Sequence, residues 1–274
     1  MTRKEEHTTN ILTHDITIGS YHTRKDFHLI PVRKPVVQPP IEKTVTLEVP
    51  GASGQADLSH SLTGYPVFKE REGSWEFYLE PGVDRVWYAY QYLRSTLART
   101  ARRGARVVLD DEPSFYYLGA VWAGGAPSYS EQYAKITLNY RLYPFKFLAK
   151  PLETDWLWDE FNFETDLAPA RLGSLVLDAA DTAIAPVRLP ATDRPALLKL
   201  CVYGADVNFV LRYNGASGAV VAQGVLREQD AYTDILLQPA ANRNGGMVDI
   251  YYLTLTKAAG SAAEVRGSYE PGYL

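Results

Sequence analysis

The sequence predicts a mainly β protein with two domains and one long helix, and three observations lead to that prediction. Aromatic residues make up 12% of the 274 residues and include 19 tyrosines, which are enriched in strands. Short segments that alternate polar and apolar side chains end repeatedly at Gly, Pro, Asn or Asp, as strands end at turns. Only one segment repeats its apolar residues with the period of a helix. The chain is long enough for two ordinary domains.

The first half of the chain contains four alternating segments that we interpret as strands. They are residues 44–49, 75–80, 106–109 and 134–143. Each ends at turn-forming residues, among them the acidic run 110–112 before Pro113. We expect the longest segment to stop at Pro144, because proline lacks the N–H that a strand interior donates.

One segment, Asp84 to Thr100, has the pattern of an amphipathic helix. We interpret Asp84 as its N-cap and Gly104 as the residue beyond its end. Its apolar residues recur at helical spacing at Val86, Tyr90, Leu93 and Leu97. The basic side chains that follow suit the negative end of a helix dipole better than a phosphate site, and they are Arg99, Arg102, Arg103 and Arg106.

A Pro-rich segment and a change of composition divide the chain. Proline fixes φ and removes a donor, so residues 31–40 must be extended, and we interpret them as a spacer or arm and not as a core element. We place a domain boundary near residue 150, which gives domains 1–150 and 151–274. The first carries 19 Lys and Arg against 16 Asp and Glu, and the second carries 9 against 16. This asymmetry indicates two units with different surroundings.

The second domain contains a series of short β segments without a helical period. They are residues 197–203, 207–213, 219–226, 235–238, 248–256 and 264–269. Asn214-Gly215 and Asn244-Gly245 have strong hairpin chemistry. Short strands with frequent turns predict a β-sandwich.

The composition excludes several classes of protein. A net charge of −4 gives no general attraction for nucleic acid. No apolar run approaches the ~20 residues of a membrane span, and the N-terminus lacks the apolar core of a secretion signal. The single cysteine, Cys201, excludes an intramolecular disulfide and lies in an apolar segment, so we expect it to be buried. We therefore expect a soluble protein that is made in the cytoplasm.

No motif of a nucleotide-binding loop, a zinc protease or a serine hydrolase occurs in the sequence. The carboxylates at 110–112 precede a proline, where a turn is the commoner reason for them. The five acids between 155 and 166 are typical of solvated surface rather than of a glycosidase pair. His14, His22 and His28 lack the spacing of metal ligands. The sequence predicts no catalytic residue, no cofactor and no metal site, and therefore no enzyme.

Aromatic side chains offer one binding hypothesis. The candidates for stacking on a sugar ring or contacting a partner are Trp156, Trp158, Tyr213 and Tyr232. Most large aromatic side chains fill a core instead, so the hypothesis requires that these rings be exposed.

Three stretches of the first half carry recognisable motifs in a fixed order. Residues 47–59 contain a strand–turn–strand motif with Pro50, Gly51, Gly54 and Asp57; residues 107–119 contain Asp110, Pro113, Tyr117 and Gly119; and residues 134–147 contain Pro144 near the end of a long strand. Together they resemble the N-terminal domain of the distal tail proteins of siphophages. Residues 202–204, 213–215 and 269–274 are similar to the galectin-like C-terminal sandwich of that family.

This resemblance implies a structural role in a bacteriophage virion. Proteins of this family form a hexameric hub ring at the distal end of the tail tube, through a sandwich-like N-terminal domain. Their C-terminal domains, similar to galectins or carbohydrate-binding modules, point outward. The implied partners are further copies of the chain, the tail tube protein, the tail-tip or tail-associated protein, and receptor-binding or side-fibre proteins. The implied location is the tail tip, assembled in the host cytoplasm, and segment 31–40 would cross a neighbouring subunit.

Other functions stay open at the level of sequence. A carbohydrate-binding adhesin would use the C-terminal sandwich directly on host glycan, and binding would be lost on a change such as Trp156→Ala. A tail-associated wall hydrolase would need a site that the sequence does not display. A baseplate component of a prophage or contractile system has the same sequence features as a siphophage protein.

Overall fold

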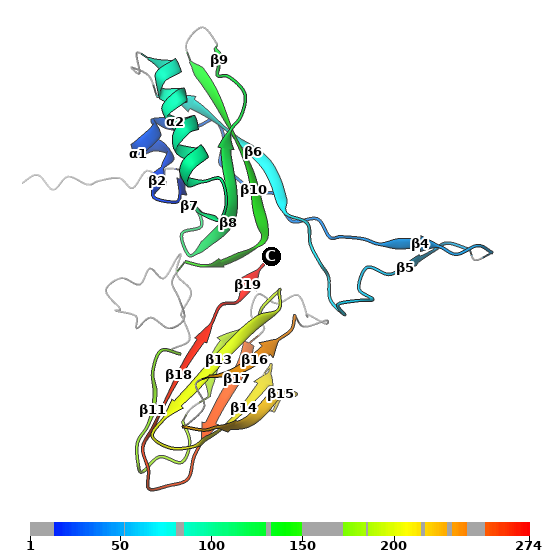
Figure 1. Cartoon of the computed structure of the whole chain (residues 1–274), viewed down its shortest axis with the longest axis vertical. Coiled ribbons are helices and arrows are strands. Elements are labelled where there is room, and N and C mark those ends of the chain that lie inside the picture. Colours follow the sequence, from blue (N-terminus) through cyan, green and yellow to red (C-terminus); the bar gives the residue numbers. More distant parts are fainter. Residues whose placement is uncertain are drawn as a thin grey trace, which may run out of the picture. The chain divides into compact units, whose positions relative to one another are not determined.

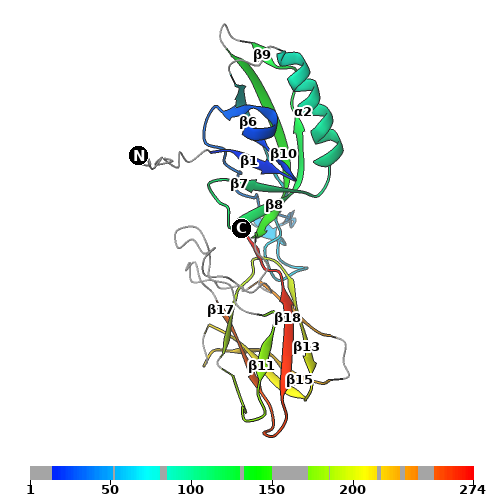
Figure 2. The same ribbon diagram turned by 90° about the vertical axis from the view of Figure 1, so that its left-hand side faces the viewer.

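The computed structural model describes residues 14–51, 53–80, 85–129, 133–149, 172–184, 186–214, 217–228, 232–239 and 250–274. It confirms the mainly β fold, because strands and two helices form the regular structure of these residues. The chain divides into two compact units, one of residues 1–38 and 70–143 and the other of residues 39–69 and 144–274. Figures 1 and 2 show the elements of each unit from two directions.

One sheet forms the body of the first unit. Its strands follow the order β2-β1-β7-β8-β10-β6-β3, with β9 also beside β10. Their bounds are β1 Ile16–Ile18, β2 Tyr21–His22, β3 Leu29–Pro31, β6 Arg71–Leu79, β7 Ala105–Leu109, β8 Phe115–Ala123, β9 Ser128–Tyr129 and β10 Ala134–Leu148. The longest, β10, runs antiparallel to β6 with Leu138 opposite Trp75.

Alternate residues of β6 and β10 build the core of this unit. Phe77 on β6 and Ile136 and Leu138 on β10 are buried, because side chains two apart share a face of the sheet. The rings of Trp75 and Tyr140 stack with their centroids 4.2 Å apart. Burying each such side chain stabilises the fold by about 1.5–3 kcal/mol.

The predicted helix is present as α2, Val86–Thr100, which lies along the sheet (Figure 1). Its residues Tyr90, Leu93 and Leu97 are buried at the predicted spacing. Gly104 has the expected positive φ of 64°, although the C-cap is Ala101. The N-cap is Arg85, which makes no side-chain capping bond, so the prediction that Asp84 is the N-cap is wrong.

The sequence pattern does not predict the second helix, α1, Thr23–Phe27. Five residues are too few to show a helical period. The helix begins because His22 Nδ1 accepts hydrogen bonds from the N–H groups of Arg24 and Lys25. These bonds satisfy donors that every helix start leaves open.

The expectation that Pro144 ends the long strand is wrong, because β10 continues to Leu148. The pairing with β6 ends at Leu142, and the pairing with β19, Gly272–Tyr273, begins at Lys146. Pro144 therefore lies between the part of β10 that pairs with β6 and the part that pairs with β19. Neither of these two ladders uses the N–H that proline lacks.

The Pro-rich segment follows β3 and forms no further strand, and the expectation that it lies outside the core is wrong for Val37. Val37 is buried in the core of the first unit. The indole Nε1 of Trp75 donates to the Val36 carbonyl at 3.0 Å, and the Gln38 N–H donates to the Tyr140 hydroxyl at 3.0 Å. The backbone of a proline-rich segment forms few hydrogen bonds within itself, so side chains of the sheet form hydrogen bonds with its backbone groups.

The second unit contains the predicted β-sandwich, built from two four-stranded sheets. One has the order β11-β18-β13-β16 and the other the order β12-β17-β14-β15. Their bounds are β11 Leu175–Leu177, β12 Val187–Pro190, β13 Ala196–Tyr203, β14 Val207–Tyr213, β15 Val220–Leu226, β16 Thr233–Leu237, β17 Ile250–Thr256 and β18 Ala263–Tyr269. The core between the sheets contains Leu198, Leu200, Phe209 and Leu253.

Two further expectations concern this unit. Cys201 is buried, as the apolar segment around it predicts. Asn214 has a positive φ of 54°, which a hairpin turn requires, but Gly215 and the Asn244-Gly245 turn lie outside the described residues. No helix in the described parts of either unit is long and apolar enough to cross a membrane.

Candidate functional site

The candidate sugar-stacking residues are spread over different environments. Trp156 and Trp158 lie outside the described residues. Tyr213 packs at the rim of the sandwich core, with its ring centroid 5.5 Å from that of Tyr251. Tyr232 is exposed just before β16.

The motif after β7 has a structural role. Asp110 follows the strand, and the N–H of Glu112 donates to the Leu109 carbonyl. The N–H of Phe115 donates to the Glu112 carbonyl, which closes the turn that contains Pro113. The buried Tyr117 donates from its hydroxyl to Glu112 Oε2 at 3.2 Å. Burial first and the Glu112 carboxylate second raise the pKa of Tyr117 above its ordinary range.

Gly119 allows two strands to approach each other closely. A Cβ at this position would lie 2.2 Å from the Arg141 carbonyl oxygen and 2.6 Å from Leu142 Cα on β10. Glycine is therefore the one residue type that fits without movement of the backbone.

The motif of residues 47–59 forms a separate two-stranded hairpin of β4, Thr46–Glu48, and β5, Gln55–Asp57. Pro50 precedes a turn in which Gly51 and Gly54 have φ values of 84° and 88°. Asp57 Oδ1 accepts the Ser59 N–H at 2.9 Å, and the hydrogen bonds from Ser59 lower the pKa of Asp57. The turn chemistry therefore fixes the register of the hairpin.

This hairpin is amphipathic, and its apolar face is exposed. Leu47 is opposite Ala56, so their side chains share one face with Val45 and Val49, while Thr46 and Glu48 point to the other. Leu47 is 53% exposed. We call this set the arm face, and it comprises Val45, Leu47, Val49, Ala56 and Leu58. An isolated two-stranded hairpin is marginally stable in water, so an uncovered arm face indicates a partner.

The outward side of α2 is the second exposed apolar surface. Tyr88 and Tyr92 lie one turn apart and are 68% and 53% exposed, and Trp87 beside them is half-exposed. The helix contains no acidic residue and carries Arg94 and Arg99. We call Trp87, Tyr88 and Tyr92 the helix patch. Large exposed aromatic groups of this kind are enriched at protein interfaces.

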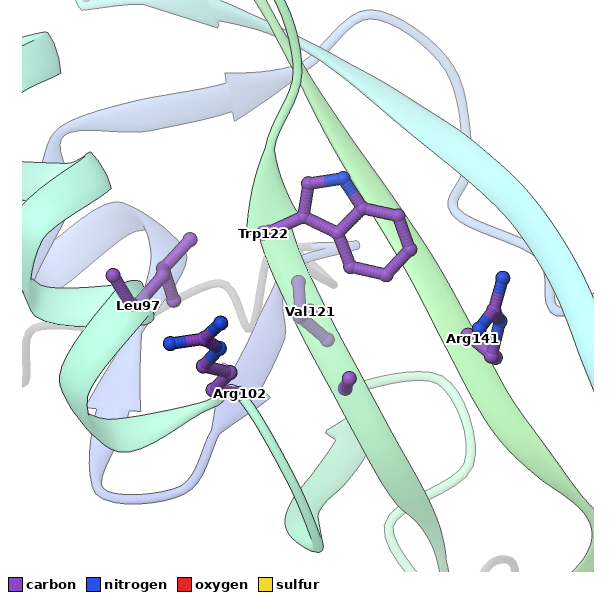
Figure 3. A pocket seen from close by; sticks show the side chains of 7 residues that line it. Leu97, Arg102, Val121, Trp122 and Arg141 are labelled. Carbon is purple, nitrogen blue, oxygen red and sulfur yellow. The ribbon is translucent and has the colours of Figure 1, made fainter.

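A hollow of about 320 Å³ lies between the end of α2 and the sheet. Figure 3 shows Val121 and Trp122 on β8, Leu97 and Arg102 on the helical side and Arg141 on β10. Arg141 is already paired with Glu72 at 2.7 Å. The lining is mainly apolar and contains no nucleophile or general base, so it offers a contact surface rather than reactive chemistry.

Three side chains are close enough to hold a metal ion, namely Asp15, His22 and Asp110, whose ligand atoms lie within 4.8 Å of one another. The sequence does not predict this group, because Asp110 is distant in the chain from Asp15 and His22. Asp15 Oδ2 pairs with Arg24 Nε at 3.0 Å. His22 Nδ1 caps α1, which places the ring proton on Nε2, and Nε2 faces Asp110 at 3.4 Å. A cation already balances Asp15 and the histidine has no free lone pair, so the group fits a helix cap better than a metal site.

Comparison with known proteins gives a match among solved structures but none among sequences. No family model and no curated protein matches the sequence. Among solved structures, the chain is similar to the SPP1 Dit (gp 19.1) protein, described as a paradigm of the hub adsorption apparatus in phages that infect Gram-positive bacteria. The match covers 95% of this chain and 99% of that chain, with a TM-score of 0.50 and 14% sequence identity. The chain therefore has the fold of a phage distal tail protein, as the sequence motifs predict.

Proposed function

We propose that this protein is a structural component of a bacteriophage tail tip. It forms a hexameric hub ring at the distal end of the tail tube, joins the tube to the tail tip and anchors receptor-binding or side-fibre proteins. The fold shared with the SPP1 hub protein over most of both chains supports this proposal. Such a protein works by contact, so the proposal includes no catalytic step and no cofactor.

The observation that carries the proposal is the arm face. Its apolar residues alternate as if one side of the hairpin were buried, yet Val45 and Leu47 are exposed. At the base of the hairpin, the Lys43 N–H donates to the Val67 carbonyl and Phe68 packs edge-on against Phe145 with centroids 5.9 Å apart. The hairpin is therefore anchored at its base and uncovered toward its tip, as expected of an arm that another subunit completes.

The helix patch is the complementary surface on the next copy. A closed ring needs two different surfaces per subunit, one docking on the other. The hairpin residues 44–63 carry Glu48 and Asp57 and no Lys or Arg, whereas α2 and its preceding residue carry Arg85, Arg94 and Arg99 and no acid. Apolar contact and opposite charge thus favour the arm face of one copy on the helix patch of its neighbour.

The assembly state of the purified protein tests the ring. We expect light scattering on a sizing column to give a mass of about six subunits, and negative-stain images to show a ring with a central channel. The variant Leu47→Asp should be monomeric, because it places a charge on the arm face. Thr46→Asp, on the opposite face of the same strand, is the matched control and should still assemble. A wild-type protein that stays monomeric at every concentration, even beside tail-tube protein, would overturn the proposal.

A direct role in glycan binding is the second candidate. Tyr203 on β13 is half-exposed, its ring lies 5.1 Å from the Arg266 guanidinium, and Arg266 pairs with Glu264 at 2.8 Å. An aromatic face beside hydrogen-bonding charges suits a sugar ring. Saturable binding of host-surface polysaccharide, lost in Tyr203→Ala, would favour this function. Binding that is unchanged in that variant would count against it.

A further inference from the structure

The edge strand β15 of the sandwich has one of the features that protect free strand edges, a β-bulge at Val221, but lacks the others. It ends the order β12-β17-β14-β15, and no strand in the described ranges pairs with its outer edge. It is seven residues long, and Val220–Leu226 contains neither a charged residue nor a proline. Free edges are usually short, charged, interrupted by proline or covered, because their backbone groups otherwise pair with another chain.

The other edge strands of the sandwich have such protection. Strand β11 has three residues, and β12 carries Arg188 and Pro190. Strand β16 carries the exposed Asp234. Among the described edges of the two sheets, β15 is therefore the one strand longer than three residues that carries neither a charge nor a proline.

The exposed valines of β15 are not needed for the core. Val220, Val221 and Val225 are 45%, 42% and 46% exposed. The contacts with the core come from Leu226, which is buried, from the partly buried Ala222, and from Gly224, where a Cβ would lie 3.0 Å from the Phe209 ring. The surface valines thus leave an apolar contact surface beside the free backbone groups.

Exposed apolar side chains also lie on the other sheet of the sandwich. Strand β16 lies next to β15. Leu236 on β16 is exposed and lies opposite the exposed Leu197 on β13, and Tyr232 is exposed at the start of β16. Both leucines face away from the sheet that contains β15, because their neighbours Ile235, Leu237 and Leu198 face the core. A strand laid along β15 would therefore take its apolar contacts from the exposed valines of β15 itself.

We infer that the free edge of β15 binds an extended peptide strand supplied by another protein, which adds a fifth strand to the sheet. The free N–H and C=O groups of the edge determine the class of the occupant, because an extended strand is what pairs with all of them. A second copy pairing β15 with β15 would give a two-fold contact, which closes on itself and does not fit between the subunits of a ring. The inference that the occupant comes from another protein thus rests on the proposed ring. The inference that the edge of β15 accepts a strand does not.

A peptide that copies β14 is a suitable probe, because β14 is the strand that already pairs with β15. The labelled peptide, Val207–Tyr213 flanked by lysines, is titrated against the full-length chain and followed by fluorescence anisotropy. We expect saturable binding, with slower amide exchange in residues 219–227. The same peptide with proline in place of Val210 should not bind, because proline cannot donate to the ladder.

Variants of the chain locate the binding edge. Val221→Lys should weaken binding at least about tenfold, since lysine is a residue that blunts natural edges. Val176→Lys, an exposed valine on β11, is the control and should bind like the wild type. Absence of peptide binding, or equal binding by Val221→Lys, would overturn the inference even if the ring forms. Dimers of two subunits that disappear in Val221→Lys would assign the edge to a second copy instead.

Discussion

At the scale of single residues, Gly119 gives the sharpest prediction about stability. Its neighbours are backbone atoms of Arg141 and Leu142, which cannot rotate away as a side chain can. We expect Gly119→Ala to lower the free energy of unfolding by about 1–3 kcal/mol, the usual cost of overpacking. Gly125→Ala is the control, because a Cβ there meets no atom within 4 Å. Urea denaturation measures both, and equal stability of the two variants would contradict the prediction.

Tyr117 gives a prediction about pH. Because burial and Glu112 raise its pKa above the ordinary value near 10, the folded protein holds this proton more tightly than the unfolded chain does. Stability is then unaffected below about pH 9 and falls as the pH rises past 10. In Tyr117→Phe the loss of stability between pH 9 and 11 should be smaller. Part of the loss should remain, because burial also raises the pKa of Tyr140. Urea denaturation midpoints across this range measure how stability changes with pH in the wild type and in Tyr117→Phe. The same pH dependence in both proteins would exclude Tyr117 as its cause.

These residue-scale roles explain what the sequence could and could not predict about the site. A family motif identifies Gly119 and Tyr117, but the structural roles of these residues depend on contacts with residues far along the chain. Gly119 faces Arg141, and the ring of Tyr117 lies 5.5 Å from the Arg71 guanidinium. No local pattern contains such contacts. The group of Asp15, His22 and Asp110 has no sequence signal for the same reason.

At the scale of elements, the arm face and the helix patch predict the outcome of mixing two defective variants. Leu47→Asp removes the arm face and keeps the helix patch, whereas Tyr88→Asp does the reverse. Each variant alone should be monomeric. In a mixture, the intact arm of one should dock on the intact patch of the other and stop at two subunits, because both remaining surfaces are defective. Light scattering measures the mass of the mixture, and a mixture that stays monomeric would exclude this pairing of surfaces.

Elements with a clear period were predictable, and short ones were not. The helix α2 and the strands β6, β7 and β10 follow patterns of 3.6 and 2 residues that their own side chains display. The nine-residue β8 has no such alternation, and the sequence pattern does not predict it. Strands β1 to β3 have two or three residues each, too few for a pattern. The continuation of β10 beyond Pro144 depends on β19, more than 120 residues later, so only the fold reveals it. The alternation of residues 44–49 predicts a strand, but not that both of its faces are exposed.

At the scale of the whole molecule, two separate cores predict two unfolding transitions. The buried cluster around Phe77 and the one around Phe209 share no residue. Truncating a buried phenylalanine costs about 3–5 kcal/mol, and the cost falls on the unit that loses the contacts. Calorimetry of the monomeric Leu47→Asp protein removes any coupling through assembly. In that background we expect Phe77→Ala to lower one transition and Phe209→Ala the other. If both changes shift a single common transition, the two units unfold as one and the chain cannot be treated as two independent modules.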